Sequence, residues 1–315
     1  MRILITGATG FVGGWLAQEI ARTTPGATLF GTSHRAVRAG DLPAGTIVRP
    51  VDLLDSAGLR EMVELARPDR VFHLAGYASG AGTDREAIFR ANVDGTRRLL
   101  EALTAAGGPC RVLLASSGYV YGQTAPGRAA RESDPPAPHG PYAESKRAME
   151  EMAQGFAGTG PLSLLVTRSF NHTGPRQGAD FVVPAFARQI ARIERGLEPP
   201  TVKHGNLDAL RDFLYVGDVV RAYRLLMDSE TMPNWRIVNV ASGVAVSVGS
   251  LLDRLIDLST VAVGQETDPS RMRPSDLAEC IGDPELLRSL TGWRPEIDLS
   301  AMLEETLAWW RQQPL

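Results

Sequence analysis

The chain has 315 residues, of which 43% are hydrophobic and 22% are charged, so it can bury a sizeable core and disorder is not expected. Its net charge of −3 excludes a general field that would attract nucleic acid or an anionic membrane, so an anionic substrate would need local arginines. Two isolated cysteines, Cys110 and Cys280, are too few for a disulfide framework or a zinc cluster and fit a reducing cytoplasm.

Short apolar runs alternate with helical patterns through the first half of the chain. Strands are expected at residues 3–6, 28–31, 46–51, 70–74, 111–115 and 163–168. Helices are expected at residues 12–23, 56–66, 85–106 and 142–155. Apolar strands separated by helices indicate an α/β fold with a doubly wound parallel sheet (a Rossmann fold), whose ligands bind beyond the carboxyl ends of the strands.

The second half changes to loops rich in Gly, Pro, Asn and Arg. Four helices are expected near residues 183–195, 216–227, 248–258 and 299–311, together with a strand at 237–239. We therefore expect residues 1–168 to form a dinucleotide-binding domain, to which the chain returns near 213–240. Residues 169–315 are expected to form mainly a smaller α/β region that binds the substrate.

Neither a membrane segment nor a metal centre is expected. The chain passes directly from Met1 into an apolar strand, and no run of about 18 apolar residues occurs, so we expect no signal peptide and no membrane span. The five histidines are not arranged as a metal set.

A glycine pattern lies between the first strand and the first helix. Gly7, Gly10 and Gly13 have G-x-x-G-x-x-G spacing, and Phe11 and Val12 stand where the helix begins. Glycine permits a tight turn and lets the backbone approach a pyrophosphate, which the positive end of the helix dipole favours. The pattern predicts a dinucleotide site; the alternative is a structural strand-to-helix turn.

The end of the second strand bears on the choice of cofactor. An NAD enzyme normally has an acidic residue there, whereas this chain has Ser33, Arg35 and Arg38. A guanidinium can bind a 2′-phosphate, so NADP(H) is predicted as the preferred cofactor and NAD(H) stays possible. The alternative is a solvated basic loop. Asp52, followed by Leu53, could accept a hydrogen bond from the adenine amino group or could be a turn residue.

Tyr142 and Lys146 are four residues apart on an expected helix. This spacing puts both side chains on one face, where the ammonium would lower the pKa of the phenol. A tyrosine with a lowered pKa can donate a proton to an alkoxide or accept one from an alcohol. Ordinary helix-surface residues also produce this spacing, so the pair gains meaning from the motifs around it.

These motifs occur together in an order that is typical of one superfamily. They are the three glycines, Asp52, HLAG at 73–76, NVDGT at 92–96, SSGYVYG at 116–122, and Tyr142 with Lys146. With them the chain resembles, over essentially its whole length, the extended short-chain dehydrogenase/reductase superfamily. The resemblance implies that Ser117 polarises the sugar oxygen, that Tyr142 transfers a proton and that Lys146 also holds the nicotinamide ribose.

The resemblance also implies several supporting residues. Asn92 belongs to the helix that supports the catalytic arrangement, although an ordinary core asparagine is an alternative reading. Ser116 is the neighbouring candidate for the catalytic serine. The further cofactor-binding candidates are Leu53, Leu74, Ala75 and Gly76.

The second half is similar to the nucleotide-sugar branch of the superfamily. The strings that carry this similarity are RSFNHTGPRQ at 168–177, FVVP at 181–184, GNLDALRDF at 205–213, DPSRMRPSD at 268–276, and GD at 282–283 with TGWRP at 291–295. The last three are similar to those of GDP-4-keto-6-deoxy-mannose reductases. A nucleotide diphosphate needs guanidinium groups at fixed positions, and Arg211 and Arg273 supply two, unless they form surface ion pairs. The other substrate-binding candidates are Asn171, Val182 and Asp276.

This resemblance implies NADP(H)-dependent reduction of the 4-keto group of a GDP-linked 4-keto-6-deoxy-hexose. Three alternatives stay open: an NDP-sugar 4-epimerase, an NDP-sugar 4,6-dehydratase, and a non-catalytic NADP-binding sensor or scaffold. Related dehydratases have a carboxylate two residues before the tyrosine equivalent to Tyr121, where this chain has Tyr119. Without that acid, elimination of water loses its acid/base group, whereas hydride transfer does not need it.

A homodimer is also implied by the resemblance. In the superfamily, the helices that correspond to 85–106 and 142–155 form a dimeric four-helix interface. Their apolar residues here are Ile88, Leu99, Leu103, Met149 and Met152.

Overall fold

The computed structural model describes residues 1–314, except for residues 35–36, 38–39, 78–83, 159, 230–232 and 273–276. Arg35, Arg38, Arg273 and Asp276, which the sequence places in the cofactor and substrate sites, lie outside the described residues.

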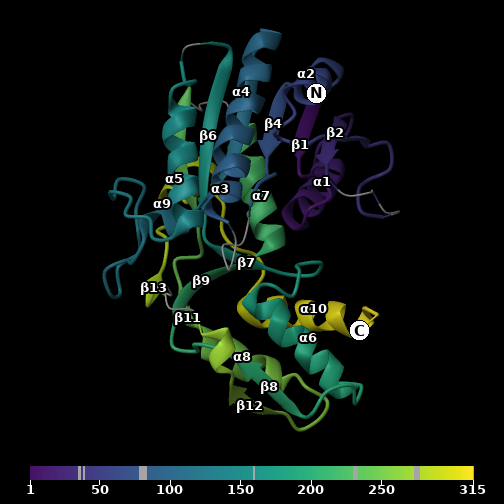
Figure 1. Cartoon of the computed structure of the whole chain (residues 1–315), viewed down its shortest axis with the longest axis vertical. Coiled ribbons are helices and arrows are strands. Elements are labelled where there is room, and N and C mark those ends of the chain that lie inside the picture. The colour runs from purple at the N-terminus through teal and green to yellow at the C-terminus, as the bar shows by residue number, and fades with distance from the viewer. Residues whose placement is uncertain are drawn as a thin grey trace.

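A seven-stranded parallel sheet forms the first part of the molecule (Figure 1). Its strand order is β10-β6-β5-β4-β1-β2-β3. The strands are β1 (Arg2–Thr6), β2 (Thr28–Ser33), β3 (Ile47–Pro50), β4 (Arg70–His73), β5 (Cys110–Ser117), β6 (Leu162–Ser169) and β10 (Trp235–Val240). The order reverses at β1, so a crevice for a ligand is expected beyond the carboxyl ends of β1 and β4. The predicted doubly wound fold is confirmed.

Helices cover both faces of this sheet. One face packs against α1 (Phe11–Thr23), α7 (Val216–Asp228) and α9 (Glu285–Thr291). The other packs against α2 (Ser56–Ala66), α4 (Gly95–Ala106) and α5 (Pro141–Gln154). Each face has its own buried apolar cluster, which explains why the central strands are apolar on both sides.

The helix expected at 85–106 is interrupted. It consists of α3 (Arg85–Phe89), a π-helical turn (Arg90–Asp94) and α4. The hydrophobic pattern alone does not reveal this turn, because a π turn adds one residue without ending the helix. Such turns are frequent at functional sites.

Four of the five apolar residues that were read as a dimer face are buried inside this chain, and Met152 is partly buried. Ile88, Leu99, Leu103 and Met149 are each at most 2% exposed. Leu99, Leu103 and Met149 belong to the core between the helices and the sheet. They therefore stabilise the monomer fold, and the predicted homodimer gains no support from them.

The second part of the molecule contains a small sheet and a separate helical core. β9 (Leu210–Tyr215) pairs with β7 (Asn171–Thr173), β11 (Ala245–Ser247) and β13 (Glu279–Cys280), and β8 (Thr201–His204) pairs with β12 (Gly264–Thr267). The helices α6 (Val182–Glu194), α8 (Val248–Asp257) and α10 (Leu299–Gln312) share one apolar core. In Figure 1 these helices lie in the lower part of the view, with β7 and β9 between them and the large sheet.

The sequence analysis predicts these three helices and α7 within about two residues but misses the short strands and α9. Strands of two or three residues, such as β13 and β7, contain no alternation long enough to be recognised. They form because partners that are distant in the sequence lie beside them.

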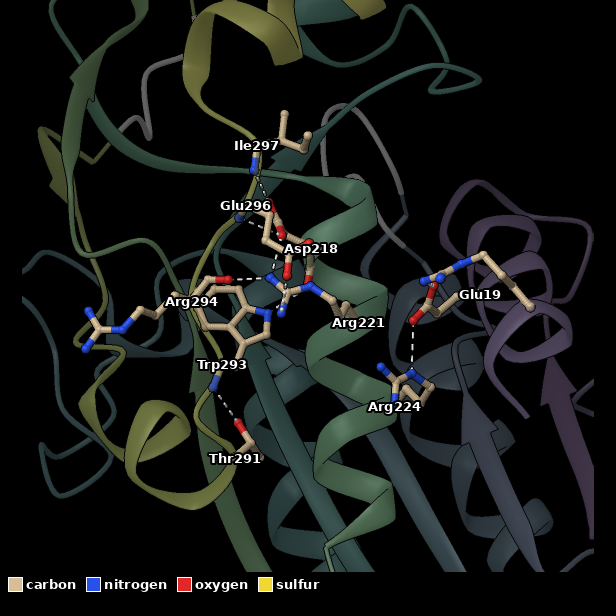
Figure 2. Close-up of polar contacts among 10 residues, drawn as sticks. Glu19, Asp218, Arg221, Arg224, Thr291, Trp293, Arg294, Glu296 and Ile297 are labelled. Carbon is tan, nitrogen blue, oxygen red and sulfur yellow. Dashed lines mark hydrogen bonds and ion pairs between the residues drawn. The ribbon is translucent and has the colours of Figure 1, made fainter. Parts of the chain in front are cut away.

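Asp218 joins the C-terminal segment to α7. Its carboxylate accepts hydrogen bonds from the backbone amides of Glu296 and Ile297, at 3.0 and 3.1 Å, and from Arg221 at 2.8 Å. The indole nitrogen of Trp293 donates to the Asp218 carbonyl at 3.0 Å. Figure 2 shows these groups converging on Asp218. Because the segment leads directly into α10, this clamp links the helical core of the second half to the large sheet.

No helix in the part of the chain that the structure describes combines the length and apolar character needed to cross a membrane. The same residues contain no group of three or more His, Cys, Asp and Glu side chains that could hold a metal ion. Both cysteines are buried and unpaired with each other.

Candidate active site

The glycine turn after β1 can accept no side chain at two of its positions. Gly7 has φ +69°, and a Cβ there would lie 3.1 Å from the backbone of Ala75. A Cβ on Gly13 would lie 2.3 Å from the carbonyl oxygen of Gly7. α1 then begins at Phe11 without a side-chain cap, so its first amides are available to a ligand. These residues fit a pyrophosphate held at a helix N-terminus.

The ends of β2 and β3 lie beside this turn. The hydroxyl groups of Thr9 and Ser33 are hydrogen-bonded at 2.6 Å. Asp52 accepts from the amide of Leu54 at 2.8 Å and lies 3.9 Å from His34, and its side chain is more than half exposed. Asp52 is thus a turn residue in this structure, and its exposed carboxylate leaves adenine recognition as a proposal. Leu53 is buried in the core on the α2 and α4 side of the sheet, so its predicted role in cofactor binding stays a prediction.

Ser117 and Tyr142 lie together at the carboxyl end of the sheet. Ser117, the last residue of β5, hydrogen-bonds the Tyr142 hydroxyl and accepts from the amide of Tyr119 at 3.2 Å. Ser116 points to the opposite face, where its hydroxyl donates to Glu150 at 2.6 Å. Strand alternation therefore places Ser117, and not Ser116, beside the tyrosine.

Lys146 lies one turn after Tyr142 on α5. Its ammonium donates to the carbonyl of Ala115 at 2.8 Å and lies 5.9 Å from the centroid of the Tyr142 ring. Desolvation raises the pKa of Tyr142 to about 12, although the hydrogen bond from Ser117 opposes the shift. The net shift is upward, and not the lowering that the sequence analysis expects, because burial of the phenol outweighs the favourable contacts.

The pKa of Lys146 is itself shifted far from its ordinary value. Burial lowers the pKa of its ammonium to about 8, and the negative charge of Glu150 opposes this shift. Glu150 is one turn further along the buried face of α5 and forms a two-point ion pair with Arg168, at 3.0 and 2.7 Å. The sequence analysis did not consider Glu150. The spacing of four residues between Lys146 and Glu150 could have shown that both lie on one face of the helix.

Asn92 is joined to α5 through its side chain. The amide nitrogen donates to the Ser145 hydroxyl at 2.9 Å, which donates in turn to the carbonyl of Tyr142 at 2.7 Å. The amide oxygen of Asn92 accepts from the backbone of Tyr77 at 2.8 Å. A Cβ on Gly76 would lie 2.6 Å from this oxygen and 3.8 Å from the Lys146 ammonium. Asn92, Gly76 and Lys146 are therefore close neighbours.

A buried histidine, which the sequence analysis did not assign, holds the π turn in place. His73 contacts the Thr6 hydroxyl through Nδ1 at 2.7 Å and the Thr96 hydroxyl through Nε2 at 2.9 Å. Thr96 donates to the carbonyl of Asn92 at 2.6 Å, so it must accept from Nε2–H of His73. Burial lowers the pKa of His73 to about 3. The imidazole is thus neutral. Its two ring nitrogens join Thr6 of β1 and Thr96 to His73 of β4, and Thr96 continues the hydrogen bonds to Asn92.

Tyr119 lies between the Ser117–Tyr142 pair and two predicted substrate residues. Its hydroxyl accepts from Nε of Arg211 at 3.4 Å and from the amide of Asn171 at 3.5 Å. After burial, Tyr119 is one of the groups that raise the pKa of Tyr142, which shows that the two phenols are near each other. The amide oxygen of Asn171 is buried and has no hydrogen-bond partner among the described residues. Buried polar atoms of this kind are suited to a polar ligand.

The predicted site residues thus form two groups in the structure. The first group lies at the carboxyl ends of the large-sheet strands and contains the glycine turn, Ser117, Tyr142, Lys146 and Asn92. The second group contains Arg211 of β9 and Asn171 of β7, which belong to the second half of the chain. Val182 is the first residue of α6 and is partly buried against the helical core, so its predicted role in substrate binding stays a prediction.

Comparison with known proteins identifies the family. The model of a family described as GDP-mannose 4,6 dehydratase matches residues 4–306. A GDP-6-deoxy-D-mannose reductase of Pseudomonas aeruginosa is 36% identical over 99% of this chain and 98% of its own length.

Solved structures show the same relationship. The structure of RMD from Pseudomonas aeruginosa complexed with NADPH matches with a TM-score of 0.86 and 34% identity, over 99% of both chains. A UDP-glucose 4-epimerase of Thermus thermophilus in complex with NAD matches with a TM-score of 0.88 and 30% identity, also over 99% of both chains. Because sequence and structure agree over nearly the whole length, the chain belongs to the GDP-mannose 4,6-dehydratase family, in the nucleotide-sugar branch of the extended short-chain dehydrogenases/reductases.

Proposed function

We propose that the protein reduces the 4-keto group of GDP-4-keto-6-deoxy-mannose, with NADPH as the preferred reductant, to a GDP-6-deoxy-hexose. The observation that carries the proposal is the hydrogen-bonded pair of Ser117 and Tyr142 beside a glycine turn, next to Tyr119. The reductase from Pseudomonas aeruginosa, 36% identical over 98% of its length, supports the choice of substrate.

Tyr142 is suited to act as the proton donor. Its raised pKa keeps the phenol protonated at neutral pH, as a general acid must be. A bound nicotinamide would supply the hydride to sugar C4. Tyr142 then gives its proton to the oxygen that becomes the new hydroxyl, while Ser117 donates a hydrogen bond to that oxygen. The Lys146 ammonium, on the same helix, favours the tyrosinate that remains.

The residue at position 119 favours reduction over dehydration. Dehydration across C5 and C6 needs an acid/base group, and related dehydratases have a carboxylate there. Tyr119 lacks that carboxylate, and its hydroxyl already accepts hydrogen bonds from Arg211 and Asn171. Hydride transfer to a carbonyl does not need that acid, so Ser117, Tyr142 and Lys146 would suffice for it.

The substrate nucleotide is proposed to bind across the second half of the molecule. Arg211 is buried at the start of β9, and its guanidinium faces the same Tyr119 hydroxyl as the Asn171 amide. A diphosphate can bind a guanidinium through two oxygens. Arg273 and Asp276 remain proposed partners of the nucleotide, by resemblance.

An NDP-sugar 4-epimerase is the second candidate. The epimerase of Thermus thermophilus, in complex with NAD, has a TM-score of 0.88 to this chain. Tyr142 would then serve twice, first in oxidation of the sugar and then in return of the hydride to its other face. An epimerase returns the hydride to the sugar, so it consumes no cofactor over a complete turnover.

One experiment separates these functions. The purified protein is incubated with GDP-4-keto-6-deoxy-mannose and NADPH, and the loss of NADPH absorbance is followed together with the mass of the product. We expect one NADPH to be oxidised for each product that has gained two hydrogen atoms. Conversion of another nucleotide sugar without net oxidation of NADPH, and no reaction with the keto sugar, would assign the protein to the epimerases.

The oligomeric state is a separate proposal. A homodimer is expected from the resemblance alone, since four of the five apolar residues that suggested it are buried within one chain. Light scattering of the purified protein measures the mass directly.

A further inference from the structure

A buried ion pair lies one helical turn beyond Lys146. The carboxylate of Glu150 on α5 accepts two hydrogen bonds from Arg168 of β6, at 3.0 and 2.7 Å, and one from the Ser116 hydroxyl of β5 at 2.6 Å. Both side chains of the pair are 1% exposed. Well-packed apolar residues often stabilise a fold as well as such a pair does, but they cannot produce an electric field at a neighbouring group.

The three charges follow one another across the large sheet, in which β4, β5 and β6 are neighbours. Lys146 lies nearest to β4: a Cβ on Gly76, just after that strand, would lie 3.8 Å from its ammonium, which donates to a carbonyl of β5. Glu150 contacts Ser116 of β5 and Arg168, which is opposite Ser116 in the sheet register. The carboxylate therefore lies between two cations, and Arg168 is the cation on its far side from Lys146.

The other titratable groups that face Lys146 in the described part of the chain are uncharged at neutral pH. Burial, and then the charge of Lys146, lowers the pKa of His73 on β4 to about 3. Burial raises the pKa of Tyr142 to about 12. The negative charge that acts on the ammonium is thus that of Glu150, and it opposes the effect of burial.

Glu150 and Arg168 have charged neighbours of their own. Arg147, on the outer side of α5, lies 3.6 Å from Glu150 but 2.8 Å from Glu151. The guanidinium of Arg168 lies over the ring of Tyr121, 4.7 Å from its centroid. These contacts hold the pair in place and leave the buried side of the carboxylate directed along the helix toward Lys146.

Lysine is rare in this chain. Two of the 33 basic residues are lysines, Lys146 and Lys203, and the others are arginines. An arginine keeps its charge at any pH at which proteins are folded, whereas a buried lysine can lose its proton. Position 146 is therefore a place where a cation depends on its surroundings to stay charged.

We propose that Glu150 is a positioning residue: held by Arg168 and Ser116, its carboxylate keeps Lys146 in the ammonium form. Glu150 touches neither the cofactor site nor the sugar site, so it acts through Lys146. The ammonium in turn favours the tyrosinate that proton transfer leaves at Tyr142, and this last step rests on the proposed function.

The two-lysine composition permits a direct test without turnover. Lys203 is exposed on β8, so a Lys203→Arg background leaves Lys146 as the one lysine. The protein is labelled with ¹³C-lysine, and the chemical shift of Cε is followed against pH by NMR. With Glu150 present, the midpoint of this titration is expected near pH 8.

Glu150→Gln is expected to lower this midpoint by about one pH unit, because the ammonium loses its nearby negative charge. Glu150→Asp keeps the charge, so its midpoint should stay closer to that of the background protein. Glu151→Gln is the matched control. It removes the same charge from the next residue, whose side chain is 58% exposed, so the midpoint should not move.

A double variant guards against unfolding, because Glu150→Gln leaves the Arg168 guanidinium buried without its partner. Glu150→Leu combined with Arg168→Met removes both charges and leaves neither unpaired. The midpoint is expected to fall in this variant too, because Glu150 is the charge nearer to Lys146. The double variant decides the question if the single variant does not fold.

An unchanged midpoint in the deciding variant overturns the inference. An equal fall in Glu150→Gln and Glu150→Asp also overturns it, since disturbed packing, and not the lost charge, would then be the cause. Failure of the wild-type protein to oxidise NADPH with the keto sugar would remove the proposed function alone, because the titration involves neither cofactor nor substrate.

Discussion

The Lys146 ammonium faces the ring of Tyr142 from 5.9 Å. It donates a hydrogen bond to the backbone carbonyl of Ala115. Burial of both groups explains how one helix holds a phenol that stays protonated and an ammonium that is easily deprotonated, with pKa values of about 12 and about 8. The two groups therefore titrate in different pH ranges, and their roles can be separated by experiment.

The rate of keto-sugar reduction is expected to fall as the pH rises through about 8. Lys146 loses its charge there, and the tyrosinate left by proton transfer loses its nearby cation, whereas Tyr142 keeps its proton until about 12. The measurement is kcat against pH. Lys146→Arg keeps a positive charge over this range, so a decline near pH 8 that persists in this variant would contradict the assignment.

Replacing the two neighbouring serines is expected to have different effects. Ser117→Ala removes the hydrogen bond to Tyr142 and should lower kcat by at least about tenfold, with little change in stability. Ser116→Ala instead leaves the buried carboxylate of Glu150 without one donor and should lower the free energy of unfolding by about 1–3 kcal/mol. Steady-state kinetics and urea unfolding of both variants distinguish the effects. Equal kinetic losses would show that strand alternation does not decide the role.

Tyr119→Phe is expected to weaken binding of the sugar nucleotide. The change removes the hydroxyl that accepts hydrogen bonds from Arg211 and Asn171, so the guanidinium loses a fixed position. Loss of a hydrogen bond of about 1 kcal/mol corresponds to a rise in KM of roughly fivefold. KM for NADPH serves as the internal control, because Tyr119 lies on the substrate side. A rise in KM for NADPH alone would contradict the position of Tyr119 on the substrate side.

His73 is expected to make the fold sensitive to acid. Its pKa is about 3 in the folded protein and 6.5 ordinarily, so between these values the unfolded chain binds more protons. The free energy of unfolding therefore rises with pH from about 3 to 6.5 and is lost as the solution is acidified through that range. The contribution is at most about 1.4 kcal/mol for each pH unit.

The check is urea unfolding at several pH values, for the wild type and His73→Asn. The variant loses the hydrogen bonds to Thr6 and Thr96, so it should be less stable at neutral pH but less dependent on pH below 6.5. An unchanged slope in the variant would show that another group causes the acid sensitivity.

Asp218→Asn is expected to destabilise the protein strongly. The buried carboxylate accepts from two backbone amides and from Arg221, and an amide cannot accept all three bonds. Breaking a buried ion pair costs about 3–5 kcal/mol, which urea unfolding would reveal. Asp228→Asn, on the same helix, is the matched control: Asp228 is more exposed and pairs with Arg224, so a change below about 1 kcal/mol is expected. Similar losses in both variants would contradict the clamp.

Several features could be predicted from the sequence alone. The alternation of apolar strands and helices predicts the doubly wound sheet, because central strands buried on both faces must be apolar throughout. Gly7 and Gly13 predict the phosphate turn, because no other residue fits their backbone contacts. The spacing of Tyr142 and Lys146 predicts one helix face. These are local properties, which depend on neighbours in the chain.

Only the tertiary structure decides how these groups act on one another. The pKa of Tyr142 depends on how deeply the phenol is buried and on Ser117, which comes from a different strand. The π turn at Asn92 is tied to β4 by Thr96, which bonds both His73 and the Asn92 carbonyl. Desolvation, hydrogen-bond direction and close packing arise between segments that are distant in the sequence, so no local pattern of residues contains them.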